Sequence, residues 1–294
     1  MDYRYIVITP ARNEAEYLPD TIRSMTSQTM VPLEWVIVND GSSDETGALI
    51  DAAAAKYPWI TAIHVLTGDQ TSVRGDRAID AKEIIAFHKG FHRSKFAESW
   101  DFVVKLDADV GFSADYFERC LQEFTRDPML GVGGGSVVNK IPGGFERESH
   151  PVFHVRGATK IYRRDCWEAM GGISTAQGWD TLDEVKANQL GWQTRTFSDI
   201  EILHYRPTGA ANGAWKNGVK NGMWSYQIGY HPLYLLLRSA RQLFRRPYLT
   251  GSVALVTGYC LAALTGNART DSDLARYVRQ QQWNRIAGKP SIWR

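Results

Sequence analysis

Short apolar segments alternate with stretches of helical pattern over the first 140 residues, and this alternation limits the fold more than any other feature of the sequence. Strands are expected at Tyr5–Ile8, Trp35–Val38, Ile63–Leu66 and Phe102–Leu106. Helices are expected at Glu16–Gln28, Asp44–Tyr57 (with Ser43 as its N-cap), Ala81–Phe91 and Ala114–Thr125. Strand–helix units of this length favour a sheet flanked by helices. The expected fold class is therefore α/β, with a mixed, mainly parallel sheet.

The alternation becomes irregular after Asp127-Pro128 and stops at Pro207. Between these two points, strands are expected at Gly131–Val138, Ala158–Tyr162, Thr194–Phe197 and Ile200–His204, and helices at Asp165–Met170 and Asp180–Leu190. We therefore expect two parts, an α/β domain of residues 1–206 and a helical C-terminal extension of residues 207–294.

The charges divide at the same place. The chain has a formal net charge of +2, but residues 1–206 sum to −8 and residues 207–294 to +10, because the extension holds 12 basic and two acidic side chains. Three distant cysteines form no CxxC pair, which argues against a disulfide framework or a zinc site and favours a reducing compartment. The first residues contain only a four-residue apolar run, so no signal peptide is expected and the predicted location is cytoplasmic.

Polar residues follow three of the predicted strands. Ligands of parallel sheets bind beyond the carboxyl ends of the strands, so these residues are the ones to examine for chemistry. Thr9-Pro-Ala-Arg-Asn-Glu14 contains neither GxGxxG nor GxxxxGK[ST], so it supports neither a dinucleotide site nor a P-loop. In Asn39-Asp-Gly-Ser-Ser-Asp44, Asp40 either accepts hydrogen bonds from a base or ribose, or serves as a turn or capping residue.

Asp107-Ala108-Asp109 follows the fourth predicted strand. Period-two alternation would direct both carboxylates to the same side, where they can approach one ligand. Carboxylate oxygens suit Mg²⁺ or Mn²⁺ and the diphosphate that such an ion bridges.

Pro10–Glu14, Val36–Asp44 and Lys105–Asp109, in this order and spacing, resemble the inverting family 2 glycosyltransferases of GT-A fold, and the resemblance extends over residues 3–210. It implies a nucleotide-diphosphate-sugar donor and a divalent cation, Mn²⁺ or Mg²⁺. It assigns the donor site to Thr9, Pro10, Ala11, Asn13, Glu14, Asp40, Lys82, Asp107, Ala108 and Asp109. Asp109 would also bind the metal. Lys82 stands where the family often has the arginine of an Ala-Arg-Asn element. Arg74 and Arg77 are competitors, and a solvated helix position is the alternative for Lys82.

An inverting transfer needs a carboxylate that takes the proton from the acceptor hydroxyl. The family resemblance assigns this base to Asp180, eleven residues before Gly191, with Trp179 in place of the usual Glu. Asp183 and Glu184 are rivals, and helix capping is the structural alternative for Asp180.

The resemblance also implies that His204 completes the metal site, whereas a structural role is the alternative. Arg206 would contact phosphate or face water. The glycines of Gly133–Gly135 and the segment Gly157–Tyr162 would form the acceptor side or serve turns and bulges.

The extension contains 22 residues without a charge, Pro247–Ala268. Their glycine, serine and threonine content favours a buried or interfacial helix over a membrane span. Arg238, Arg241, Arg245 and Arg246 precede this segment and suit an anionic membrane surface. Packing on the core or on a second subunit is the alternative. Nucleic-acid binding is not expected, because the basic extension contains no known nucleic-acid-recognition motif.

The expected function is therefore the transfer of a sugar from a nucleotide-diphosphate-sugar donor to a hydroxyl of a glycan or lipid-linked acceptor. The expected location is the cytoplasm or the inner face of the cell membrane, and a homo-oligomer is left open. One alternative is a sugar-phosphate nucleotidyltransferase, although the loop after the first strand supplies only Arg12 for a triphosphate. The other is a non-catalytic nucleotide-sugar-binding protein, to which the change at Trp179 lends support.

Overall fold

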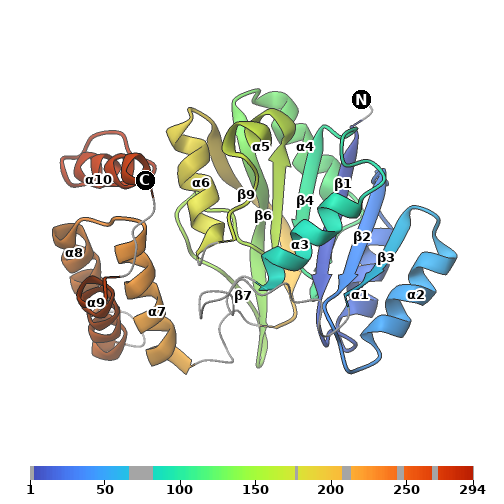
Figure 1. The fold of residues 1–294 in the computed structure, drawn as a ribbon, viewed down its shortest axis with the longest axis horizontal. Coiled ribbons are helices and arrows are strands. Elements are labelled where there is room, and N and C mark those ends of the chain that lie inside the picture. Colours follow the sequence, from blue (N-terminus) through green and yellow to red (C-terminus); the bar gives the residue numbers. More distant parts are fainter. Residues whose placement is uncertain are drawn as a thin grey trace. The chain divides into compact units, whose positions relative to one another are not determined.

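The computed structural model describes residues 3–65, 82–175, 178–206, 213–243, 248–266 and 271–293. The chain divides into two compact units, which are described separately below (Figure 1). The first unit comprises Met1–His150 and His154–Arg206, and the second comprises Pro151–Phe153 and Pro207–Arg294. The main division follows Arg206, where the charge of the sequence changes sign.

The first unit is built on one nine-stranded mixed sheet with the order β3-β2-β1-β4-β8-β6-β9-β5, and β7 pairs with β6. The strands are β1 Tyr5–Ala11, β2 Glu34–Asn39, β3 Ile60–His64, β4 Phe102–Leu106, β5 Val110–Phe112, β6 Leu130–Ile141, β7 Gly144–Arg147, β8 Thr159–Arg163 and β9 Gln193–His204. The four strands β3, β2, β1 and β4 run parallel, as the strand–helix alternation predicts. β8 pairs antiparallel with β4 and β6, and β6 runs parallel to β9.

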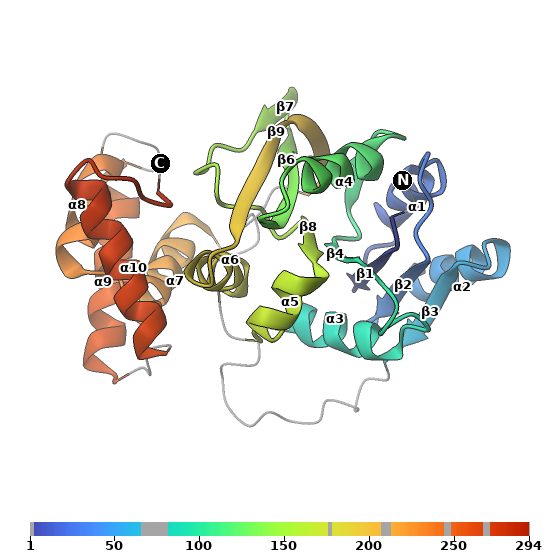
Figure 2. The ribbon, with the colours of Figure 1, turned by 90° about the horizontal axis from the view of Figure 1, so that it is seen from above.

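Helices cover both faces of this sheet (Figure 2). Alternate residues of the buried strands belong to two separate cores: Tyr5 and Val7 to one, Ile6 and Ile8 to the other. The first core includes side chains of α1 Leu18–Thr26, α2 Thr46–Lys56 and α4 Tyr116–Arg126. The second includes side chains of α3 Lys82–Arg93, α5 Arg164–Met170 and α6 Trp179–Gln189. Strands buried on both faces explain why β1, β2 and β4 are mostly apolar rather than alternating.

Several local expectations differ from the structure. The expected strands at Thr194–Phe197 and Ile200–His204 are one strand, β9, and the short strands β5 and β7 were not expected. Ser43 is not the N-cap of α2, because the helix begins at Thr46 with Glu45 as the N-cap. The expected strand end at Leu66 lies outside the described residues.

The second unit is helical, with α7 Gly213–Gln227, α8 Pro232–Gln242, α9 Tyr248–Leu264 and α10 Ser272–Ile286. Glycines allow α7 and α9 to approach closely: a Cβ atom on Gly222 would meet the Leu255 carbonyl, and one on Gly258 would meet the Val219 carbonyl. Within the residues that the structure describes, no helix combines the length and the apolar character needed to cross a membrane.

Candidate active site

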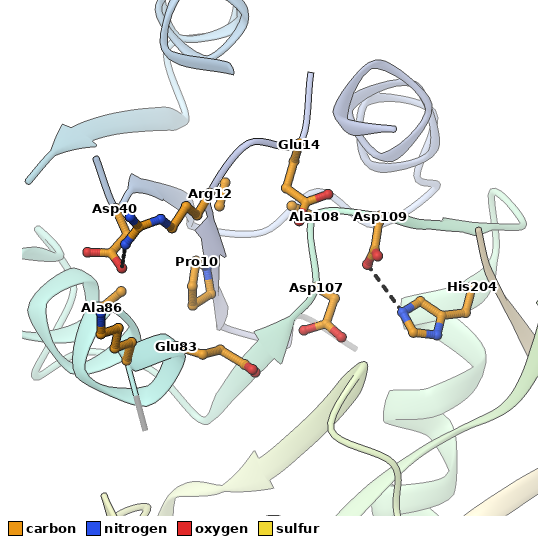
Figure 3. A pocket seen from close by; sticks show the side chains of 12 residues that line it. Pro10, Arg12, Glu14, Asp40, Glu83, Ala86, Asp107, Ala108, Asp109 and His204 are labelled. Atoms are coloured by element: carbon orange, nitrogen blue, oxygen red, sulfur yellow. Dashed lines mark ion pairs between the residues drawn. The ribbon is translucent and has the colours of Figure 1, made fainter. Parts of the chain in front are cut away.

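An open pocket of about 290 Å³ lies beyond the carboxyl ends of β1, β2 and β4 (Figure 3). It is lined by Pro10, Ala11, Arg12, Glu14, Asp40, Lys82, Glu83, Ala86, Asp107, Ala108, Asp109 and His204. Nine of these residues are among those that the sequence assigns to the donor and metal sites. Parallel strands end at one edge of a sheet, which is why residues so distant in the sequence meet here.

Asp107, Asp109 and His204 each offer one ligand atom, and these atoms all lie within 4.8 Å of one another. His204 Nε2 is 3.3 Å from Asp109 Oδ1 (Figure 3). The two aspartates lie in the bend between β4 and β5, so strand alternation is the wrong reason for their convergence. Two carboxylates and an imidazole in this arrangement fit a divalent cation such as Mn²⁺ or Mg²⁺.

Asn139 orients the histidine of this cluster. The Asn139 amide donates to Glu148 at 2.8 Å, which leaves its Oδ1 directed at His204 Nδ1, 3.2 Å away. A proton on Nδ1 leaves the lone pair of Nε2 on the side of the aspartates. Partners of this kind fix the ring orientation of metal-binding histidines. Burial acts to lower the pKa of His204, but the hydrogen bond and charge of Asp109 outweigh it and raise this pKa.

A buried lysine, Lys105, forms an ion pair with Asp107. Lys105 is the fourth residue of β4, and its ammonium forms ion pairs with Asp107 and Glu83 and donates to the Gly157 carbonyl at 2.8 Å. Burial acts to lower the pKa of Lys105, but the charges of Asp107 and Glu83 outweigh it, so the ammonium stays protonated. Burial raises the pKa of Asp107 to about 6, although Lys105 opposes the shift.

Glu14 connects the loop after β1 to the end of β9. Arg206 donates two hydrogen bonds to its carboxylate, at 2.7 and 3.2 Å, so this arginine does not face water alone. Burial and the nearby charge of Asp109 raise the pKa of Glu14 to about 7, although Arg206 opposes the shift. The pocket floor is therefore rich in carboxylates that a cation would stabilise in their charged forms.

The expected nucleoside side of the pocket is polar. Asp40 lies 3.9 Å from Arg12, and α2 begins six residues beyond the aspartate, so Asp40 does not cap that helix. Lys82 is the first residue of α3 and lines the pocket. Its competitors Arg74 and Arg77 lie outside the described residues.

Two expected donor-site residues do not line the pocket. The Thr9 side chain is fully buried and accepts a hydrogen bond from the Trp35 indole at 2.9 Å. Asn13 has a positive φ of 55°, and its side-chain oxygen accepts from the Ser43 amide at 2.8 Å. Asn13 therefore joins the loops that follow β1 and β2, which is a structural role.

Asp180 is partly exposed in the first turn of α6, but it does not line the pocket. The N-cap of this helix is Gly178, so Asp180 is not the cap. Asp180 lies beside Gly157, whose carbonyl binds Lys105: a Cβ atom built on the glycine would be 3.9 Å from the Asp180 Cβ. Among the described residues, its carboxylate accepts no hydrogen bond and forms no ion pair.

The two rivals of Asp180 are held in a buried cluster. Lys160 pairs with Asp183 at 2.9 Å and with Glu184 at 2.8 Å, and none of these side chains is exposed. Tyr162 donates to Asp183, while Glu184 also contacts His154 at 2.8 Å and accepts from the Val155 amide at 2.6 Å. Neither carboxylate is accessible to an acceptor, which leaves Asp180 as the accessible carboxylate of this segment.

Arg12, Glu83 and Ala86 line the pocket but were not predicted as site residues. Three supporting residues were not predicted either: Lys105 beside Asp107, Asn139 beside His204, and Lys160 beside Asp183 and Glu184. A lysine inside an apolar strand was the available signal for Lys105 and Lys160, because a buried lysine requires a partner of opposite charge. The glycines at 133 to 135 serve packing: Cβ atoms there would meet Phe197, the Thr159 carbonyl and the Ile200 carbonyl.

This sheet with its aspartate-bearing edge is that of GT-A glycosyltransferases, as solved structures of similar fold indicate. The mannosyltransferase PcManGT from Pyrobaculum calidifontis, in complex with GDP-Man and Mn²⁺, aligns with a TM-score of 0.55 and 18% identity over 94% of this chain and 79% of that chain. Residues 1–349 of Staphylococcus aureus TarS, in complex with UDP-GlcNAc, align with a TM-score of 0.53 and 15% identity. The alignment covers 97% of this chain and 80% of that chain. The expected fold class is confirmed.

Residues 6–73 match the family model described as Glycosyl transferase family 2, so the resemblance to family 2 is confirmed for this part of the chain. An undecaprenyl-phosphate mannosyltransferase of Micrococcus luteus is 30% identical over 141 residues, 46% of this chain and 52% of that protein. A chondroitin synthase of Pasteurella multocida is 29% identical over 124 residues, 42% of this chain. The chain spans about half the length of the first relative and 11% of the second.

Proposed function

We propose that this chain is a metal-dependent, inverting glycosyltransferase that moves a sugar from a nucleotide-diphosphate donor to a hydroxyl of a glycan or lipid-linked acceptor. The observation that carries the proposal is the convergence of Asp107, Asp109 and His204 in a pocket at the strand ends of a GT-A fold. The named activities of the relatives and the donors in the similar structures support the same reaction class.

The pocket residues suit the two ends of such a donor. Asp40 would accept hydrogen bonds from the base or ribose, while Lys82 and Arg12 would face the diphosphate. Asp109 and His204 would hold a divalent cation, with Asp107 beside it. Such a cation would neutralise negative charge that grows on the leaving diphosphate.

Asp180 is the proposed base, taking the proton of the acceptor hydroxyl as its oxygen attacks the anomeric carbon. Asp180 is partly exposed and its Cβ lies beside Gly157, whereas Asp183 and Glu184 are buried in ion pairs with Lys160. The Lys160 ammonium also donates to the Asp180 backbone carbonyl. This bond anchors the start of α6 through its backbone and does not engage the Asp180 carboxylate.

The donor proposal is tested by thermal shift with UDP-, GDP- and dTDP-sugars, with and without Mn²⁺. We expect one nucleotide class to raise the unfolding temperature, and to do so more with Mn²⁺. His204→Ala should remove the Mn²⁺-dependent part, whereas His64→Ala, at a histidine outside the pocket, should keep it. The absence of stabilisation by every donor in the presence of metal would contradict the proposal.

The base proposal is tested with Asp180→Asn, which is isosteric. We expect turnover to fall at least a hundredfold, within the range of general-base contributions of about 10²–10⁴. The donor-induced thermal shift should be unchanged. Asp199→Asn, at an exposed carboxylate on β9, is the matched control and should retain full turnover. Activity of the Asp180→Asn protein above a few per cent would exclude this base.

A further inference from the structure

The second unit presents an unusual helix. α9 contains no charged residue, and such a helix is normally buried on all sides. One face of α9 is buried, with Ala254, Leu255, Gly258, Tyr259 and Ala262. The opposite face carries Leu249, Val253, Val256 and Cys260, at i, i+4, i+7 and i+11, and three of these four are exposed.

α8 repeats this pattern beside it. Leu233, Leu236, Leu237 and Ala240 share one face, at i, i+3, i+4 and i+7, and all four are exposed, whereas Leu235 is buried on the other side. A mostly apolar groove of about 500 Å³ adjoins the α9 stripe and is lined by Ser239 of α8, by Leu243 just after it, and by Val253, Val256, Cys260 and Leu264 of α9. We name the eight residues of the two exposed stripes the α8–α9 face.

The charges around this face are of one sign. α8 carries Arg238 and Arg241, both exposed, and neither α8 nor α9 contains an acidic residue. Residues 207–294 as a whole sum to +10. Association with a second copy through this face would bring these arginines together, which like-charge repulsion opposes.

We propose that the α8–α9 face docks on an anionic lipid bilayer. The exposed leucines and valine would enter the boundary between headgroups and acyl chains, while the arginines at the border would meet the lipid phosphates. A bilayer is the partner that offers an apolar layer under a negatively charged surface. The inference does not depend on sugar transfer, since it rests on the second unit alone.

Flotation of the full chain with vesicles tests the proposal, using phosphatidylcholine with an equal part of phosphatidylglycerol, against pure phosphatidylcholine. We expect the protein to float with the anionic vesicles, to float less with the neutral ones, and to be released by 1 M NaCl. Arg241→Gln should weaken binding about fivefold, the equivalent of ~1 kcal/mol per basic residue at the surface.

The double variant Leu237→Asp/Val253→Asp should weaken binding more than tenfold, because it places two charges in the apolar face. Met129→Asp is the matched control: Met129 is 48% exposed in the first unit, similar to Leu237 at 46%, and the variant should float like the parent. A far-ultraviolet circular dichroism spectrum and an unfolding temperature equal to those of the parent would show that the double variant is folded.

Three results would overturn the proposal. The first is full-length protein that stays at the bottom of the gradient with anionic vesicles. The second is a double variant that floats like the parent. The third is a dimer in light scattering that the double variant converts to a monomer, which would assign the face to a second copy. The flotation contains neither donor nor metal, so failure here and failure of the proposed sugar transfer are distinguishable.

Discussion

Replacing Lys160 by methionine should destabilise the first unit strongly. Methionine has a similar volume, so the substitution removes the charge and leaves the packing nearly intact. The Asp183 and Glu184 side chains, both fully buried and at 2.9 and 2.8 Å from the ammonium, then have no lysine partner. Breaking a buried pair by removing one partner costs about 3–5 kcal/mol. For a unit of this size, this is a fall of roughly 10 °C in the unfolding temperature.

The destabilisation should depend on pH in a defined direction. Burial already raises the pKa of Asp183 to about 7, with Lys160 opposing the shift, so loss of the lysine raises this pKa further. A carboxyl group whose folded-state pKa exceeds its unfolded value stabilises the fold at low pH, and this stability is lost as pH rises through the folded pKa. The deficit of Lys160→Met is therefore largest near pH 8 and smaller near pH 6.

Urea unfolding followed by tryptophan fluorescence at both pH values measures the deficit. Lys95→Met, at an exposed lysine, is the control and should change stability by less than about 0.5 kcal/mol. Lys160→Met/Asp183→Asn should recover part of the loss, because it removes one of the unpaired charges. A Lys160→Met protein within 1 kcal/mol of the parent at pH 8, or a deficit that is equal at both pH values, would refute the reasoning.

Three further predictions concern other parts of the first unit and the cysteines. Asn139→Leu should weaken Mn²⁺ binding in the presence of nucleotide by about 10–100-fold, because His204 loses the oxygen that orients it; calorimetry that gives an unchanged affinity would contradict this. Thiol alkylation at pH 8, followed by mass spectrometry, should modify the exposed Cys260 and spare Cys120 and Cys166. Burial raises the pKa of both buried thiols, that of Cys166 to about 12, so equal labelling of all three would be inconsistent with the packing. Gly90→Ala should cost about 1–3 kcal/mol in scanning fluorimetry, because the added methyl would lie 2.7 Å from methyl groups of Ile8 and Val38; an unchanged unfolding temperature would count against this close approach.

The parallel half of the sheet was predictable because its strands are mostly apolar and alternate with segments of helical pattern along the chain. β5 and β7 were not, because three or four residues carry too little pattern to be recognised. β9 was split into two in the prediction since Ser198 and Asp199 interrupt the apolar pattern. Its pairing with β6 shifts register between Gly135 and Ser136, so one strand continues across the polar residues.

The site was predictable where a residue's role follows from its place at a strand end, as for Asp40, Asp107 and Asp109. It was not predictable where the role follows from long-range packing. Thr9 belongs to the same motif as Pro10, but alternation along β1 directs its side chain to Trp35 and the core. Asn139 supports His204 from β6, a pairing of neighbouring strands that the sequence alone does not specify.

The tryptophan at position 179, which departs from the expected Glu, fits the charge balance around the candidate site. Its ring lies close to two buried ammonium groups, with its centroid 5.3 Å from that of Lys105 and 5.4 Å from that of Lys160. Each lysine already has two carboxylate partners, so a Glu at position 179 would add a fifth carboxylate around two cations. A tryptophan face stabilises both cations without adding charge. The tryptophan therefore adds no negative charge beside Asp180, whose carboxylate forms no ion pair with either lysine, and it gives no support to a non-catalytic protein.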